Sequence, residues 1–195
     1  MEYKDFIKPG NKVIFYPMSF EWVNNFDVDA QVVEISEYRP YYRDGSPDPT
    51  PEQYDESCYV EITGDVRDES QIRLEDLFAI EPCDEKFVYC GQEYKCIGKN
   101  DELEMIVLED GDDFIVCNED GAEELRDVYD LDREELCRLF NKCSIGSIYL
   151  ADYENDLGIT RCQACDILEA YAESVEWDDD LMRPNDFADW ILGEA

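Results

Sequence analysis

Short stretches of apolar residues, some alternating with polar ones, recur through the first part of the chain. Residues 12–16, 30–35, 58–63 and 71–74 are rich in β-branched and aromatic side chains, and the last two stretches alternate cleanly. Stretches of this length and composition are typical of β-strands. We therefore predict that residues 1–82 form a small antiparallel β structure.

The order of these four strands resembles a small β-barrel of the Src-homology or Tudor kind. A Pro-Gly pair precedes the first strand, and the sequence LEDLFAI closes the last strand. The resemblance covers about 75 residues and includes no diagnostic motif. It implies a fold and no function, because small barrels of this type serve many unrelated activities.

A long polar stretch, residues 38–56, separates the second and third predicted strands. It contains four prolines and four tyrosines, so it cannot form regular structure and is predicted to be a surface loop. One interpretation is a mobile connection. The other is a contact loop in which Tyr41 and Tyr42, exposed beside Arg39 and Arg43, meet a protein partner.

A second β region is predicted within residues 83–131. Residues 93–98, 102–108 and 113–118 have the pattern of a meander, with turns at residues 99–101 and at Asp110-Gly111. The third of these strands contains the apolar run FIVC, which we expect to pack inward. Acidic residues flank it at the turns: Asp110, Asp112, Asp113, Glu119 and Asp120.

The remaining residues, 132–195, have the signals of helices. Asp132 and Glu135 match a capping box at the start of a helix, and Leu131 with Leu136 match its hydrophobic staple. The whole fold is therefore predicted to be α+β. It comprises an N-terminal small antiparallel β-barrel-like region (1–82), a central β-meander (83–131) and C-terminal helices (132–195), packed as one or two domains.

Two further helices are predicted in this last region. Thr160 and Gln163 repeat the capping-box pattern for a helix over residues 160–176. Asn185 is the expected cap of a final helix that stops at Gly193, since asparagine favours the first cap and glycine the last.

The helix over residues 160–176 is predicted to carry two stripes. Apolar residues at helical spacing form a core stripe: Cys165, Leu168, Ala172 and Val175. Acids repeat the same spacing one position later and continue past the helix: Asp166, Glu169, Glu173, Glu176, Asp178, Asp179 and Asp180. The first four carboxylates would lie about 5 Å apart along the helix, a spacing comparable with neighbouring phosphates on a nucleic-acid strand.

This acidic stripe has two interpretations. An amphipathic helix normally has a charged outer face, and an ordinary face mixes both signs of charge. This segment contains no Lys or Arg from residue 162 to residue 182. A solvated outer face and a phosphate-like row of carboxylates both remain open.

The charge balance is extreme and extends over the whole chain. There are 51 Asp and Glu against 16 Lys and Arg, a formal net charge of −35. Acids exceed bases in each of the three regions, so the charge does not reside in a tail. Direct binding to nucleic acid or to an anionic membrane is strongly disfavoured on this ground, and the expected partner is cationic.

Several kinds of chemistry are disfavoured by composition. The chain contains no histidine, which removes Ser-His and Cys-His nucleophile pairs and His metal ligands. Nine cysteines include the pair Cys162 and Cys165 in a CxxC, but there is no second CxxC to complete a zinc site. The acid-rich segment 108–125 does not fit an EF-hand calcium loop, whether the loop starts at Asp110 or is aligned on Gly121. We expect a protein that is not an enzyme, needs no cofactor or metal, and uses its thiols mainly for packing.

The start of the chain lacks a secretory signal, and no apolar run approaches the ~20 residues that span a membrane. Together with the odd number of cysteines, this indicates a soluble cytoplasmic protein with reduced thiols.

The sequence as a whole favours a DNA or RNA mimic. Such a protein would occlude the cationic surface of a basic nucleic-acid-binding protein without catalysis. In composition and size the chain resembles the anti-restriction and anti-CRISPR inhibitors of phages and mobile elements. That resemblance implies a restriction enzyme or a CRISPR effector as partner in the host cytoplasm, with a homo-oligomer possible. The alternatives are an immunity protein, an acidic chaperone for a cationic toxin or effector, or acidity that serves only solubility in high salt.

Overall fold

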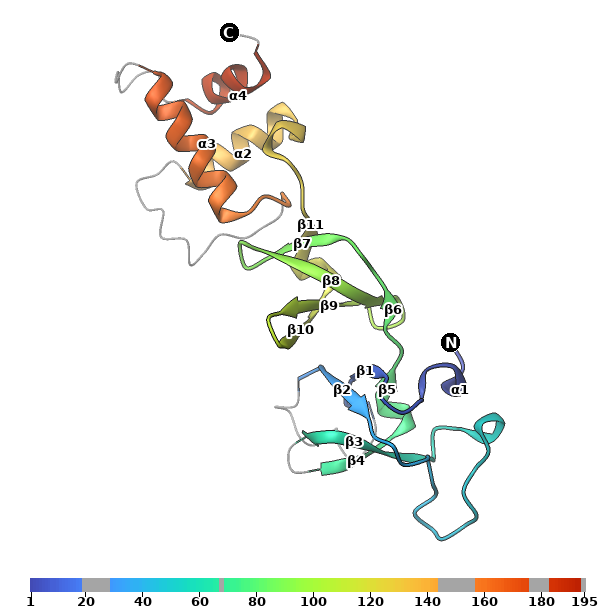
Figure 1. The fold of residues 1–195 in the computed structure, drawn as a ribbon. Helices are drawn as coiled ribbons and strands as arrows, with labels where there is room; N and C mark the ends of the chain where they lie inside the picture. Colours follow the sequence, from blue (N-terminus) through green and yellow to red (C-terminus); the bar gives the residue numbers. More distant parts are fainter. Residues whose placement is uncertain (19–28, 67–68, 144–156, 176–182, 194–195) are drawn as a thin grey trace. The chain divides into compact units, whose positions relative to one another are not determined.

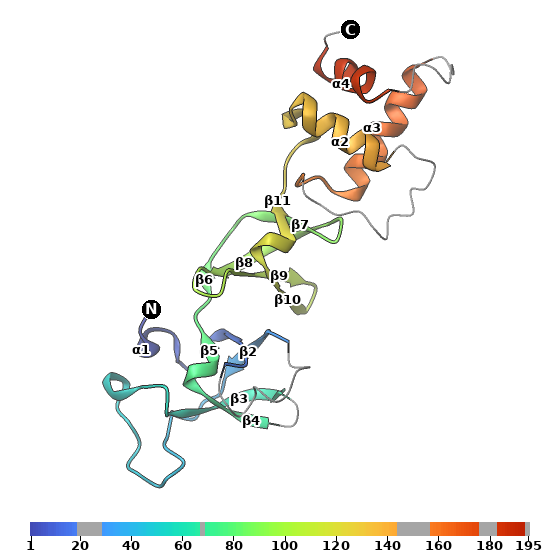
Figure 2. The ribbon, with the colours of Figure 1, turned by 180° about the vertical axis from the view of Figure 1, so that it is seen from behind.

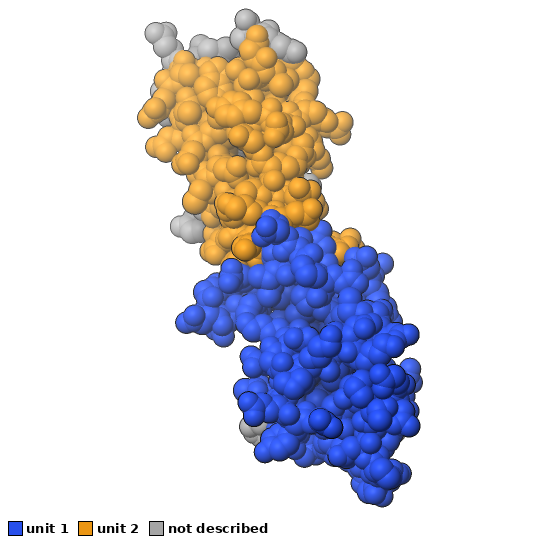
Figure 3. Space-filling view, turned by 45° about the vertical axis from the view of Figure 1, so that its right-hand side comes forward, with its two compact units in different colours: residues 1–84, 96–118 blue, residues 85–95, 119–195 orange. Residues whose placement is uncertain are grey.

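The computed structural model describes residues 1–18, 29–66, 69–143, 157–175 and 183–193. The predicted α+β class is confirmed, with two antiparallel sheets followed by helices (Figure 1). The chain divides into two compact units, shown in Figure 3. Unit 1 comprises Met1–Asp84 and Cys96–Asn118, and unit 2 comprises Glu85–Lys95 and Glu119–Ala195. None of the described helices is long and apolar enough to cross a lipid bilayer.

The first sheet contains the four strands predicted in the N-terminal region and one more. Its order is β4-β3-β2-β1-β5. The bounds are β1 (Lys12–Phe15), β2 (Gln31–Ile35), β3 (Tyr59–Val66), β4 (Glu69–Arg73) and β5 (Leu77–Phe78). Val13, Ile14 and Phe15 of β1 are fully buried. The described strands form an open sheet that ends at β4 and β5, so they approach a barrel in strand order without closing one.

A short helix, α1 (Tyr3–Phe6), packs against the core of unit 1 and was not predicted from the sequence. Two 3-10 turns, η1 (Pro51–Gln53) and η2 (Leu74–Asp76), belong to the same unit. Asp76 is buried, and its carboxylate accepts a hydrogen bond of 2.9 Å from the backbone N–H of Met18. This bond holds the chain after β1 against η2.

The second sheet has the order β10-β9-β8-β7-β11, with β6 also paired to β8. The bounds are β6 (Glu81–Pro82), β7 (Lys86–Tyr89), β8 (Gln92–Asn100), β9 (Met105–Asp110), β10 (Asp113–Asn118) and β11 (Ala122–Glu124). Consecutive pairing of β8, β9 and β10 confirms the predicted meander. The inward packing expected for FIVC is only partial, because β10 is an edge strand with a neighbour on one side; its four apolar residues are half-buried.

Three helices form the C-terminal part of unit 2 and lie together in Figures 1 and 2. They are α2 (Arg133–Cys143), α3 (Arg161–Ser174) and α4 (Pro184–Leu192), preceded by η3 (Glu119–Gly121) and η4 (Val128–Asp130). Their core centres on three buried aromatic rings, Phe140, Tyr171 and Phe187. The centroids of these rings are 5.3 to 6.2 Å apart, in the tilted and edge-to-face arrangements that aromatic pairs prefer.

The predicted cap of α3 is present. The Gln163 N–H donates to Thr160 Oγ1 at 3.1 Å, and the Thr160 N–H donates to Gln163 Oε1 at 2.8 Å. The Asp132–Glu135 capping box of α2 is formed in the same way. These reciprocal bonds satisfy backbone donors that the first turn of a helix leaves without partners.

The predicted cap of α4 is wrong, although the predicted end is right. The helix begins at Pro184, and the N-cap is Arg183 rather than Asn185. Proline is favoured at the first helical position because its fixed φ suits a helix. The backbone N–H that proline lacks would have no partner within the helix at that position. Gly193, with φ of 68°, ends the helix in the left-handed conformation as expected.

Arg126 connects three parts of unit 2. Its backbone N–H donates to the Gly158 carbonyl at 2.8 Å, and its own carbonyl accepts from Gln163 Nε2 at 3.0 Å. Its guanidinium binds both carboxylate oxygens of Glu135 at 2.8 and 3.1 Å and the Asp130 carbonyl at 2.9 Å. The chain after β11 is thereby joined to the first turns of α2 and α3.

We expect Arg126→Met to lower the free energy of unfolding of unit 2 by about 1–2 kcal/mol at pH 7. Methionine keeps much of the apolar stem but loses the charged hydrogen bonds, whose value is reduced here because the arginine is partly exposed to solvent. Urea unfolding followed by circular dichroism at 222 nm would measure the change, since α2, α3 and α4 all belong to unit 2.

The ion pair between Arg126 and Glu135 makes the stability of unit 2 depend on pH. Hydrogen bonds from Arg126 and then from the Asp132 N–H hold the pKa of Glu135 below its ordinary value. The stabilisation is therefore complete above the ordinary glutamate pKa of about 4.3 and is lost as pH falls through the lowered value. The difference in stability between wild type and Arg126→Met should shrink between pH 6 and pH 3. A difference that stays constant over this range would contradict the role given to the pair.

Candidate acidic interaction surfaces

The core-facing side of α3 is rotated by one residue from the predicted stripe. The buried residues are Ala164, Ile167 and Tyr171. The predicted stripe residues Cys165, Leu168, Ala172 and Val175 are only partly buried. Both sets have helical spacing, and the large ring of Tyr171 decides between them because it fills the centre of the aromatic cluster.

This rotation places the acidic stripe nearly opposite the core. At about 100° per residue, Asp166, Glu169 and Glu173 lie about 160° around the helix from the buried face, rather than the about 110° that the predicted stripe implied. All three side chains are exposed. None of the three carboxylates has an ion-pair or hydrogen-bond partner among the residues that the structure describes. We call these three residues the α3 acid row.

The row covers about 10 Å of helix, from Asp166 to Glu173, at 1.5 Å per residue. Pairs of like charge three and four residues apart destabilise a helix slightly, so the fold itself gains nothing from this arrangement. The other members of the predicted stripe lie outside the described residues: Glu176, Asp178, Asp179 and Asp180.

A second acidic group lies at the turn between β9 and β10. Gly111, with φ of 63°, and Asp112 form a two-residue turn, and Asp110 and Asp113 pair directly across it. Like charges directly opposite each other on adjacent strands are unfavourable. Asp110, Asp112 and Asp113 are exposed, and their carboxylates have no ion-pair or hydrogen-bond partner within the described part of the chain. We call these three residues the hairpin acids.

The structure does not bring all the predicted turn acids together. Glu119 and Asp120 follow the opposite end of β10, about 17 Å along the strand from Asp113. They lie in η3, which belongs to unit 2, whereas the hairpin acids belong to unit 1. Both are exposed. They therefore do not extend the hairpin acids into one continuous patch of unit 1.

Tyr41 and Tyr42 are half-buried rather than exposed, which corrects the basis on which they were selected as contact residues. Tyr41 exchanges two backbone hydrogen bonds of 2.9 Å with Tyr59 of β3. Tyr42 packs against the core of unit 1. Arg43 lies over the Tyr59 ring at 4.0 Å, so this part of the loop is held onto the sheet by aromatic and cation–π contacts.

The candidate interaction surfaces of this fold are thus the α3 acid row and the hairpin acids. No family model, curated protein or solved structure matches this chain. The likeness to small barrels and the compositional likeness to anti-restriction and anti-CRISPR inhibitors therefore remain interpretations of the sequence.

One thiol of the CxxC pair, Cys165, has a raised pKa, which is the opposite of what a redox motif needs. Cys162 is exposed in the first turn of α3, and Cys165 is partly buried. Burial, followed by the nearby Cys162 and Asp166, raises the pKa of Cys165. Cys58 and Cys96 are buried thiols whose pKa is also raised, that of Cys96 to about 12, with burial as the largest cause for both. These thiols suit packing better than nucleophilic chemistry.

Groups of three or more Cys, Asp or Glu residues arranged to hold a metal ion are absent from the described residues. Two features of unit 1 and unit 2 were missed by sequence reasoning: the Arg126 connection and a pocket in unit 1 beside α1. Neither has a local sequence signal, because each joins segments that are far apart along the chain.

Proposed function

We propose that this chain is a binding protein that occludes the cationic, nucleic-acid-handling surface of another protein by presenting carboxylates where that surface receives phosphates. The proposal names a basic partner, such as a restriction enzyme or a CRISPR effector, in a cell invaded by a phage or another mobile element. Inhibition by this route is stoichiometric and needs no catalysis.

The α3 acid row is the observation that carries this proposal. Its carboxylates face away from the core, lack counter-ions in the described structure and project from one rigid helix. A fixed array of this kind suits a groove built for a phosphate backbone, because its charges need little reorganisation on binding. The hairpin acids, fixed in the same way on a two-residue turn, support the same interpretation for unit 1.

The net charge of −35 adds long-range attraction to this local geometry. Opposite charge accelerates the encounter between proteins, and salt screens that attraction over a Debye length of about 10 Å at 0.1 M. Binding should therefore be fast and strongly salt-dependent. Nucleic acid should compete with the chain for the partner because both occupy the same cationic surface.

The test is affinity capture from a host lysate with the tagged protein, washed at low and then high salt. Duplex DNA and RNA are added as competitors in parallel samples, with a neutral polymer as control. We expect capture of a basic nucleic-acid-binding protein that is released both by salt and by nucleic acid. The purified partner should lose its nucleic-acid binding when one equivalent of the chain is added.

A captured partner that nucleic acid cannot displace would contradict mimicry and support a dedicated immunity or chaperone role for a cationic toxin or effector. Absence of any basic partner at low salt would also contradict the proposal, and would leave solubility as the use of the acidic surface.

A further inference from the structure

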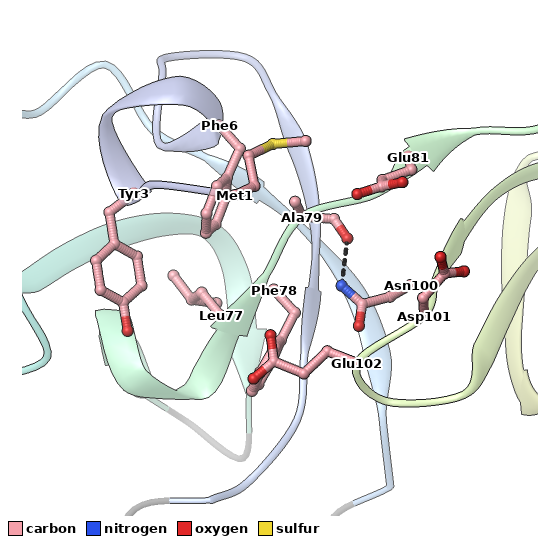
Figure 4. Close-up of a pocket in the computed structure, with 10 residues that line it drawn as sticks. All are labelled: Met1, Tyr3, Phe6, Leu77, Phe78, Ala79, Glu81, Asn100, Asp101 and Glu102. Atoms are coloured by element: carbon pink, nitrogen blue, oxygen red, sulfur yellow. Dashed lines mark hydrogen bonds between the residues drawn. The ribbon is translucent and has the colours of Figure 1, made fainter.

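A pocket of about 400 Å³ lies in unit 1, where α1, the chain after β5 and the turn after β8 meet (Figure 4). Phe6, Leu77 and Ala79 contribute to its lining and are themselves buried, so its floor is apolar. Tyr3 and Phe78, both half-buried, add aromatic side chains to the lining. A pocket of this size is at the small end of the range for ligand sites and suits a single side chain.

Three carboxylates stand on the rim of this pocket, above its apolar floor. Glu81 comes from β6, and Asp101 and Glu102 come from the turn after β8; all three are exposed. The lining includes no Lys or Arg side chain. Lys99, which lies opposite Glu81 in the pairing of β6 with β8, is the nearest base in the sheet register and is not part of the lining.

The turn that supplies two of these carboxylates is held in place by Asn100. This residue is 7% exposed; its Nδ2 donates to the Ala79 carbonyl at 2.9 Å, and its Oδ1 accepts from the Leu103 N–H at 2.9 Å. Figure 4 shows the first of these bonds between the floor and the rim of the pocket. The backbone that carries Asp101 and Glu102 is therefore held in place before any ligand arrives.

Tyr3 lies at this pocket in a negatively charged environment. Burial first, and then the nearby Glu56, Glu75 and Glu102, together raise the pKa of Tyr3 to about 12. Its phenol therefore stays neutral at physiological pH and keeps a proton that it can donate.

We propose that this pocket binds one arginine side chain of a protein partner. The apolar stem of the arginine would lie against Leu77 and Phe78, and its guanidinium would meet the carboxylates of Glu102 and Asp101 or Glu81 at the rim. Arginine combines an apolar stem with a planar cation. The cation stacks on aromatic rings and forms bidentate hydrogen bonds with carboxylates. The inference rests on the proposed function, because it takes the arginine from the basic partner.

The test uses peptides, so that it does not depend on finding the partner. Acetyl-Gly-Arg-Gly-amide is titrated into the full chain and followed by NMR, against the same peptide with citrulline in place of arginine. Citrulline has nearly the same shape and no charge. We expect the arginine peptide to shift the methyl signals of Leu77 and Ala79 and the side-chain amide of Asn100 saturably, and the citrulline peptide to bind at least tenfold more weakly.

Two double variants with equal charge change complete the experiment. Glu81→Gln with Glu102→Gln should weaken binding of the arginine peptide at least fivefold. The control, Glu37→Gln with Asp48→Asn, removes two exposed carboxylates of unit 1 that do not line the pocket and should leave binding unchanged. Amide spectra of both variants verify that the fold is intact.

Equal binding of the arginine and citrulline peptides, shifts spread evenly over the acidic surface, or equal loss in both double variants would overturn the proposal. These results separate the two hypotheses. Capture of a basic partner without peptide binding would contradict the arginine pocket and still support nucleic-acid mimicry. Peptide binding without a partner that nucleic acid displaces would support the arginine pocket and contradict nucleic-acid mimicry.

Discussion

Reversing the α3 acid row, Asp166→Lys, Glu169→Lys and Glu173→Lys together, is expected to weaken binding to the basic partner by at least 100-fold. Each reversal replaces an attraction by a repulsion, and about 1 kcal/mol per site is a modest value for charges about 4 Å apart near water. Three sites give about 3 kcal/mol, which corresponds to a factor above 100. Titration calorimetry or surface plasmon resonance at fixed salt would measure it.

The helix itself should tolerate this change. The three side chains are exposed and opposite the core, and lysine is a good helix former. The matched control is the triple variant Asp29→Lys, Glu37→Lys and Asp48→Lys, which makes the same change in net charge at exposed positions of unit 1. It should lower affinity only by the general loss of attraction, roughly tenfold or less at 0.15 M salt, where screening is strong.

Equal effects of the two triple variants would show that α3 is not the contact surface. The hairpin acids would then be the next surface to reverse, with Asp110→Lys, Asp112→Lys and Asp113→Lys compared against the same control.

The second large effect is expected from Gly158→Ala, which should destabilise unit 2 by at least about 3 kcal/mol. Gly158 is buried with φ of 67°, and a Cβ atom there would lie 2.1 Å from the Glu124 carbonyl oxygen. The obstructing atom is backbone at the end of β11, which is paired with β7, so it cannot move aside cheaply. A loss of this size is a large fraction of the 5–15 kcal/mol that holds a typical domain together.

Gly193→Ala is the matched control for this substitution. Gly193 has nearly the same φ, 68°, and its added Cβ would meet no atom within 4 Å. It should cost only the strain of a left-handed alanine, about 1 kcal/mol. Urea unfolding read by circular dichroism at 222 nm compares the two variants directly. Equal losses would mean that the close approach of Gly158 to β11 contributes nothing to stability.

The strands and caps that the sequence predicted well share a local cause. The bounds of β10, residues 113–118, and the end of α4 at Gly193 follow from turn and cap residues that lie next to the elements they limit. The reciprocal bonds of Thr160 with Gln163 likewise need only a four-residue pattern. These signals are local, because the residues that form each turn or cap lie within a few positions of one another along the chain.

Features that depend on distant partners were not predictable in this way. The strand β11 exists because Ala122 pairs with Tyr89 of β7, and nothing in its three residues indicates a strand. The core face of α3 was misplaced by one residue because several apolar residues crowd its first turns and only the packing of Tyr171 selects among them. The pocket beside α1 assembles three segments, so no single stretch of sequence could reveal it.

The interleaving of the two units has a consequence for how the protein is made. The chain leaves unit 1 after Asp84, returns to it at Cys96, and leaves it again after Asn118. A ribosome that has released the first 84 residues has delivered the buried core of the first sheet, from Phe6 to Ala79, but not yet β9 and β10, which complete unit 1 later. For the same reason, no single cut of the polypeptide yields either unit whole.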